Sequence, residues 1–348
     1  MTRPGLVRPL AVTATVAAML VLTACGSGSS SDDGAETATD DGTAPAGTFE
    51  PVTIEHALGE AVIEERPERV AAWGWGSADA AIALGVVPVA VPTQSYGGDD
   101  DGMLPWNKEA IEAAGAETPA MLTEGEEPPY EEFIKADPDL ILATYSGLTQ
   151  AQYDKLSKIA PVVAYPGEAW ATPWREVITT AGEALGKAAE ADQVLTDIDE
   201  SVSAAAEAHP EFAGKSIAAV ADYGAFYVYR SADPRVEFLE DLGFETAPSV
   251  GELDTEESTF FYTISYEKVD QLDSDVLLSY ADSDKTQQAF LDSASTKTMP
   301  QYDAGTIAEA TGEEVVASVS PPTALSLTWG LDDYVDLLSE AATAADAS

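Results

Sequence analysis

The sequence is poor in the residues that bind metals and nucleic acids. It contains one cysteine and two histidines, which excludes an internal disulfide and argues against a Cys- or His-rich metal site. Basic residues are scarce, since 16 Lys and Arg stand against 62 Asp and Glu, for a net charge of −46. A surface of that sign repels the phosphates of nucleic acids and of anionic lipids. We therefore expect no nucleic-acid partner and no bound zinc or manganese ion.

Sequence signatures of common hydrolases and nucleotide-binding enzymes are also absent. The patterns G-x-S-x-G, H-E-x-x-H and G-x-x-x-x-G-K-[ST] do not occur. Paired carboxylates are unavoidable in a chain with 62 acids, so they carry no weight for a glycosidase. We expect a protein that is not an enzyme and needs no cofactor, with an anchored extracellular hydrolase as a remote alternative.

The chain begins with a short apolar run instead of a membrane span. Arg3 and Arg8 precede the apolar residues 10–22, a stretch shorter than the ~20 residues that cross a bilayer. A basic start, a short apolar core and small residues before a cleavage site predict a signal peptide over residues 1–24. Leu-Thr-Ala before Cys25 resembles the bacterial lipobox, which predicts cleavage before Cys25 and a lipid on its thiol.

Residues 25–50 follow as a segment of small and acidic residues with almost no large apolar side chain. Such a composition cannot bury a core and predicts a flexible acidic tether. A lipid on Cys25, a tether and a soluble body together predict a protein held at the outer face of the cytoplasmic membrane.

The body alternates strands and helices, which is typical of parallel sheets covered by helices. Residues 52–62 alternate apolar and polar side chains and predict a hairpin that turns at residues 58–60. Near the middle, residues 188–208 show uninterrupted helical spacing, and His209-Pro210 ends it. We expect a helix of roughly 30 Å there, either joining two lobes or lying on one larger domain.

Five short motifs occur in order in the first half of the body. They are residues 54–59 (IEHALG), 66–70 (RPERV), 84–89 (LGVVPV), 136–141 (ADPDLI) and 156–161 (LSKIAP). Together, and behind a lipobox, they resemble the substrate-binding lipoproteins of iron–siderophore ABC importers, a group that includes hydroxamate, catecholate and cobalamin binders. The resemblance extends from about residue 53 to residue 338.

This resemblance implies an α/β fold of the class III periplasmic-binding-protein type. Two Rossmann-like lobes with mainly parallel sheets, residues 51–187 and 211–345, would be joined by one long rigid helix at 188–210. Following the family pattern, we expect a helix from residue 264 toward 272, a last strand at 314–318 and a final helix at 324–338.

Residues 130–142 and 266–278 resemble each other, with Tyr, Glu, two Asp and a final Leu at matching positions. A repeat on each side of the long helix supports the two-lobed interpretation. In the family, acids at these positions meet arginine pockets on the two permease subunits. The resemblance therefore implies that Glu131 and Glu267 dock the protein on an ABC importer permease dimer.

Ligands of open α/β sheets lie beyond the carboxyl ends of the strands, where this chain is rich in aromatic residues. The predicted ligand-binding residues are Trp75, Tyr145, Trp170, Tyr227, Arg230 and Trp329. Aromatic faces and N–H or O–H donors suit the bulky, oxygen-rich surface of a ferric siderophore.

Charge favours one class of siderophore as the transported ligand. Only Arg175 and Arg230 are expected near a cleft, whereas a trianionic ferric catecholate usually needs a basic cluster. We therefore favour a ferric hydroxamate as the ligand, with cobalamin or haem as alternatives. We expect the binding protein to be a monomer.

Overall fold

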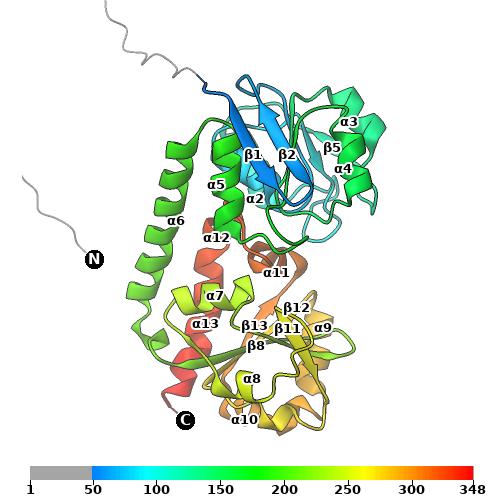
Figure 1. The fold of residues 1–348 in the computed structure, drawn as a ribbon. Coiled ribbons are helices and arrows are strands. Elements are labelled where there is room, and N and C mark those ends of the chain that lie inside the picture. Colours follow the sequence, from blue (N-terminus) through cyan, green and yellow to red (C-terminus); the bar gives the residue numbers. More distant parts are fainter. Residues whose placement is uncertain (1–48, 348) are drawn as a thin grey trace, which may run out of the picture. The chain divides into compact units, whose positions relative to one another are not determined.

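The computed structural model describes residues 49–347 of the chain (Figure 1). The predicted signal peptide, the lipidated Cys25 and the tether up to residue 48 lie outside the described residues. Within the described part, none of the helices combines the length and the apolarity that a bilayer crossing needs.

The first sheet has five parallel strands in the order β5-β4-β3-β6-β7. They are β3 (Val70–Ala72), β4 (Ala90–Pro92), β5 (Ala120–Leu122), β6 (Leu140–Ala143) and β7 (Val162–Ala164). Five helices accompany them: α1 (Ser77–Ala83), α2 (Pro105–Ala113), α3 (Tyr130–Ala136), α4 (Gln150–Leu156) and α5 (Trp174–Ala184). Every residue of β3, β6 and β7 is buried, as expected for strands covered on both faces. We call this part of the chain the first lobe.

A hairpin of β1 (Val52–His56) and β2 (Gly59–Ile63) precedes the first sheet. Its strands pair His56 with Gly59, so the turn lies at residues 57–58 and not at the predicted 58–60. Gly59 has φ 144°, which suits the residue directly after a two-residue turn because glycine has no Cβ to clash.

The second sheet is mixed, with the path β11-β9-β8-β12-β13 and β10 beside β8. Its strands are β8 (Ser216–Asp222), β9 (Phe226–Tyr229), β10 (Glu245–Thr246), β11 (Phe261–Ile264), β12 (Val276–Ala281) and β13 (Ile307–Thr311). Its helices are α7 (Pro234–Asp241), α8 (Pro248–Glu252), α9 (Asp284–Asp292), α10 (Pro300–Ala304), α11 (Glu313–Val319), α12 (Ser326–Trp329) and α13 (Leu331–Ala345), with 3-10 turns η1 (Pro210–Phe212), η2 (Val269–Gln271) and η3 (Thr296–Thr298). We call this part the second lobe.

Helix α6 (Ala188–Ala208) connects the two sheets (Figure 1). Its buried residues Ala191, Ile198 and Val202 form one stripe, which contacts α5 of the first lobe and α7 and α13 of the second. The predicted bounds of this helix are confirmed. The helix ends at Ala208, with His209 as its C-cap, because Pro210 starts the 3-10 turn η1.

The two lobes share a central topology, which confirms the predicted two-lobed α/β fold. Strand β3 pairs in parallel with β6, and β6 with β7. In the second lobe β8 pairs in parallel with β12, and β12 with β13. The antiparallel strands β9 and β11 make the second sheet mixed.

Three local predictions in the second lobe are wrong. Residues 314–318 lie in helix α11, and the last strand is β13. A short apolar run fits a buried helix as well as a buried strand, and Gly312 at φ 108° ends the strand before the run begins. The segment after β11 makes a turn and the 3-10 turn η2 in place of a helix. The final helix is split at Gly330 into α12 and α13.

Candidate ligand-binding site

The loops at the carboxyl ends of the first sheet enclose a cavity of about 590 Å³. Trp73 and Trp75 follow β3, Thr93 follows β4, and Glu124 follows β5, and all four line this cavity. Trp170, from the loop between β7 and α5, lines it too. We call it the first-lobe cavity. Its position beyond the strand ends is where open α/β sheets bind ligands.

A second cavity, of about 180 Å³, lies between the lobes. Tyr145 and Trp170 line it from the first lobe, and Arg235 and Phe261 line it from the second. We call it the inter-lobe cavity. Because Trp170 borders both cavities, the two are neighbours.

Trp170 is held at this border although half of its surface is exposed. Its backbone N–H donates to the Ser146 carbonyl at 3.1 Å, and its ring meets Tyr145 edge-on at 5.7 Å. The ring lies over Gly147, where an added Cβ would come within 2.7 Å of the indole Cε2 atom. Trp170 also has φ 59°, a left-handed conformation that is uncommon for a bulky residue. The local chain thus places an exposed aromatic face at the border of both cavities.

Arg235 is the cation of the inter-lobe cavity. Its Nε and Nη2 groups donate to the two carboxylate oxygens of Asp233, each at 2.7 Å, and its Nη1 donates to Ser320 at 2.8 Å. The guanidinium also lies 3.8 Å from the centre of the Tyr229 ring. Burial alone would lower the pKa of Arg235, but its hydrogen bonds and charge interaction with Asp233 outweigh burial and raise it. The guanidinium is therefore fully charged and paired.

The lobes are joined beside these cavities by hydrogen bonds to a second-lobe segment around residue 321. The Trp75 indole N–H donates to the Pro321 carbonyl at 2.9 Å. On helix α1, the buried Asp79 accepts from the Thr323 hydroxyl at 2.5 Å and from the Trp106 indole at 2.6 Å. Burial raises the pKa of Asp79, although these hydrogen bonds act in the opposite direction.

Of the six predicted binding residues, the structure brings Trp75, Tyr145 and Trp170 together at the cavities. Tyr227 on β9 meets the ring of Phe261 edge-on at 5.5 Å, so it contacts a lining residue of the inter-lobe cavity without lining that cavity itself. Trp329 on α12 borders none of the described cavities. Its ring lies 5.5 Å from that of Trp106, and its indole donates to Glu109 at 3.2 Å, so it contributes to the contact between the lobes.

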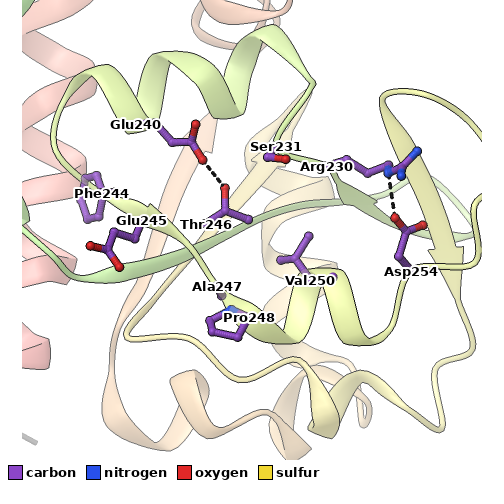
Figure 2. A pocket seen from close by; sticks show the side chains of 11 residues that line it. Arg230, Ser231, Glu240, Phe244, Glu245, Thr246, Ala247, Pro248, Val250 and Asp254 are labelled. Atoms are coloured by element: carbon purple, nitrogen blue, oxygen red, sulfur yellow. Dashed lines mark hydrogen bonds and ion pairs between the residues drawn. The ribbon is translucent and has the colours of Figure 1, made fainter.

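Arg230 lies in a separate cavity of about 550 Å³ that is lined by the second lobe alone. Figure 2 shows its side chain turned to Asp254, with which it makes an ion pair of 2.8 Å. It also donates to the Ser258 carbonyl. Arg175, the other arginine expected near the cleft, pairs with Asp199 and Asp241 at 2.9 and 3.1 Å. Neither lines the inter-lobe cavity.

Sequence reasoning missed Arg235 and Asp233. A signal was present, because Asp233-Pro234 is a typical start of a helix and Asp233 caps α7. The next residue is an arginine in the first helical turn, where the helix dipole disfavours positive charge. A positively charged side chain in that position suggests a carboxylate nearby, and here that carboxylate belongs to Asp233.

The two glutamates predicted to dock a permease are both exposed. Glu131 lies in the first turn of α3, and Glu267 lies in the turn between β11 and η2. Glu131 precedes strand β6 and Glu267 precedes strand β12. These two strands occupy corresponding positions in the strand orders of the two sheets. Within residues 49–347, no group of three or more His, Cys, Asp or Glu side chains is arranged to hold a metal ion.

Comparison with known proteins agrees with this geometry. A family model described as "Periplasmic binding protein" matches residues 70–305. The crystal structure of PiaA from Streptococcus pneumoniae TIGR4 in complex with ferrichrome is 34% identical, covers 84% of this chain and 99% of that one, and has a TM-score of 0.73. A periplasmic solute binding protein from Mycobacterium smegmatis is 28% identical, with coverage of 84% and 99% and a TM-score of 0.72.

A curated relative points to the same group. The probable siderophore-binding lipoprotein YfiY of Bacillus subtilis is 27% identical over 273 residues, which is 76% of each chain. The family model's match, residues 70–305, runs from β3 in the first lobe through α6 to α10 in the second lobe. The chain belongs to the periplasmic binding protein family, a family of solute-binding proteins that are not enzymes.

Proposed function

We propose that this protein captures a ferric siderophore, with a hydroxamate type favoured, and delivers it to an ABC importer. The observation that carries the proposal is the pair of neighbouring cavities that share Trp170, one in the first lobe and one between the lobes. Together they have a size that suits a bulky small molecule. The relative of known structure with 34% identity is described in complex with ferrichrome.

The lining supports an oxygen-rich ligand with an apolar periphery. Trp75, Tyr145 and Trp170 offer broad ring surface to such a ligand. Arg235 offers N–H donors to hydroxamate oxygens in the inter-lobe cavity. Arg235 is already paired with Asp233, which favours a neutral or cationic ferric hydroxamate over a trianionic ferric catecholate. Tyr227, Arg230 and Trp329 line neither of these two cavities, so we do not propose them as contacts of a ligand bound there.

Titration of intrinsic tryptophan fluorescence tests the ligand class. The probes are a ferric trihydroxamate, a ferric tricatecholate, cobalamin and haem. We expect submicromolar quenching by the trihydroxamate, because Trp75 and Trp170 border the cavities. Submicromolar quenching by only cobalamin or haem would replace the proposed ligand with one of those two.

The exposed acids Glu131 and Glu267 support the delivery step. They occupy matching places in the two lobes, so a two-fold permease can meet both through equivalent basic pockets. The test is Glu131→Ala with Glu267→Ala. Uptake of the ferric complex by cells should fall while the affinity of the purified protein for it stays constant.

A matched control replaces two exposed glutamates of α6, Glu200 and Glu207. This control removes the same charge from a surface with no proposed docking role, so uptake should remain at the wild-type level. Equal uptake by both double variants would contradict the proposed docking role of Glu131 and Glu267.

We further propose that a lipid on Cys25 anchors the protein to the outer face of the cytoplasmic membrane, where it acts as a monomer. The lipobox-like sequence before Cys25 supports this location, and so does a curated relative that is described as a lipoprotein. Metabolic labelling with a tagged fatty acid should mark the wild-type protein, and Cys25→Ser should be unlabelled and released into the medium.

A further inference from the structure

The arginine in the inter-lobe cavity has an acid built against it. Asp233 is the N-cap of α7, and its carboxylate accepts the backbone N–H of Arg235 at 2.9 Å in addition to the two side-chain donors. The side chain of Asp233 is 1% exposed and that of Arg235 is 18% exposed. A bidentate pair in such a dry place is tightly held, because solvent screens the attraction only weakly.

This pairing removes the net charge of Arg235 but not its capacity to donate. A guanidinium carries five N–H groups, and three of them serve Asp233 and Ser320. Tyr229 also makes a side-chain hydrogen bond with Arg235, so at least one N–H group remains for a ligand in the inter-lobe cavity. The contact with the Tyr229 ring fixes the plane of the guanidinium, so its N–H groups have a defined direction.

No other lysine or arginine among residues 49–347 lines the first-lobe or the inter-lobe cavity. Four acids do: Glu124 and Glu126 in the first-lobe cavity, and Asp233 and Glu237 in the inter-lobe cavity. Once Asp233 and Arg235 cancel each other, the remaining lining is negatively charged. Such a lining repels an anionic ligand and attracts a cationic one.

We propose that Asp233 is a specificity-determining residue that sets the charge of the accepted ferric complex. By neutralising Arg235, it leaves hydrogen-bond donors for ligand oxygens while the cavities reject complexes with net negative charge. The selected substrates are ferric complexes that are neutral or carry a pendant ammonium group. This inference rests on the proposed function, because it assumes that a ferric complex occupies these cavities.

Asp233→Asn tests the role of the charge with little change of shape. Asparagine is also a good N-cap and keeps one oxygen for the Arg235 donors, so α7 should retain its start. The probes are ferrioxamine B, a cationic ferric trihydroxamate, and ferric enterobactin, a trianionic tricatecholate. Dissociation constants for both are measured by isothermal titration calorimetry at fixed salt.

The readout is the dissociation constant of ferrioxamine B divided by the dissociation constant of ferric enterobactin. In Asp233→Asn this ratio should rise by about tenfold or more, because an uncompensated guanidinium in a weakly screened site attracts the anion and repels the cation. Asp254→Asn is the matched control, since it breaks the ion pair of Arg230 in the separate second-lobe cavity (Figure 2). Its ratio should remain that of the wild type.

Arg235→Gln provides a second variant if Asp233→Asn does not fold. It leaves Asp233 uncompensated, so the same ratio should fall below the wild-type value. An unchanged ratio in folded Asp233→Asn or Arg235→Gln, or an equal shift in Asp254→Asn, would overturn the role of Asp233. Failure of the wild-type protein to bind any ferric complex would instead overturn the proposed function itself.

Discussion

Gly147 determines where Trp170 lies, so a methyl group at this position should weaken ligand binding. In Gly147→Ala the added Cβ would lie within 2.7 Å of the indole Cε2 atom, a distance that real Cβ contacts do not tolerate. The indole ring would have to leave its place beside Tyr145, and its new rotamer would cost on the order of 1 kcal/mol. Gly147 does not have a positive φ, so the backbone itself accepts alanine.

The cost in affinity follows from the exposed half of Trp170. A large aromatic side chain buries ~150–250 Å², so a ligand lying on the exposed half covers about 100 Å² of it. At ~25 cal/mol per Å² this contact stabilises the complex by about 2.5 kcal/mol, which corresponds to roughly 60-fold in the dissociation constant. We expect Gly147→Ala to lose a large part of this contact, which should raise the dissociation constant by about tenfold or more.

Calorimetric titration with a ferric trihydroxamate measures the loss, and denaturant unfolding checks that the variant is folded. Gly167→Ala is the control, because nothing lies within 4 Å of a Cβ built at Gly167, which lies in the same connection as Trp170. Its affinity should equal that of the wild type. An unchanged affinity in Gly147→Ala would refute the role of Trp170, and an equal loss in both variants would refute the steric reasoning.

Two further predictions concern buried groups with shifted pKa values. Burial raises the pKa of Asp79 above 3.8, so its contribution to folding is greatest below that pH and is lost as pH rises through the folded-state pKa. Asp79→Asn should therefore gain stability relative to the wild type as pH rises, and a pH-independent difference in urea unfolding would contradict this. Burial lowers the pKa of His56 below 6.5, so its burial should destabilise the fold as pH falls below 6.5. His56→Asn, which can still accept the Leu58 N–H that His56 Nδ1 accepts at 3.2 Å, should lose less stability between pH 7 and pH 5 in thermal unfolding; an equal loss would contradict the prediction.

The large elements of the fold were predictable because their signals are local and repeated. Helix α6 shows apolar spacing over six turns and ends at a proline, so its bounds follow from the sequence. Residues 314–318 carry no comparable signal. Their apolar run is too short to separate a buried helix from a buried strand. The true last strand, β13, directly precedes them and could equally be chosen as the last strand from the sequence.

The candidate site was predictable only in part, for a physical reason. Tyr145 and Trp75 follow strand ends, and strand ends of a parallel sheet meet at one edge. The place of Arg235 depends on partners from three separate elements, among them Tyr229 on β9 and Ser320 after α11. Arg230 lies only five residues earlier but faces Asp254 and another cavity. Sequence spacing does not encode which of two nearby arginines meets the other lobe.

The most direct test of the whole account is a crystal structure of the protein with a ferric trihydroxamate. We predict that the complex lies against Trp170, between the first-lobe and inter-lobe cavities, with its oxygens within hydrogen-bonding distance of the Arg235 guanidinium and its iron still held by hydroxamate oxygens. A complex that binds instead in the second-lobe cavity beside Arg230 and Asp254, or that leaves Trp170 uncovered, would contradict the account.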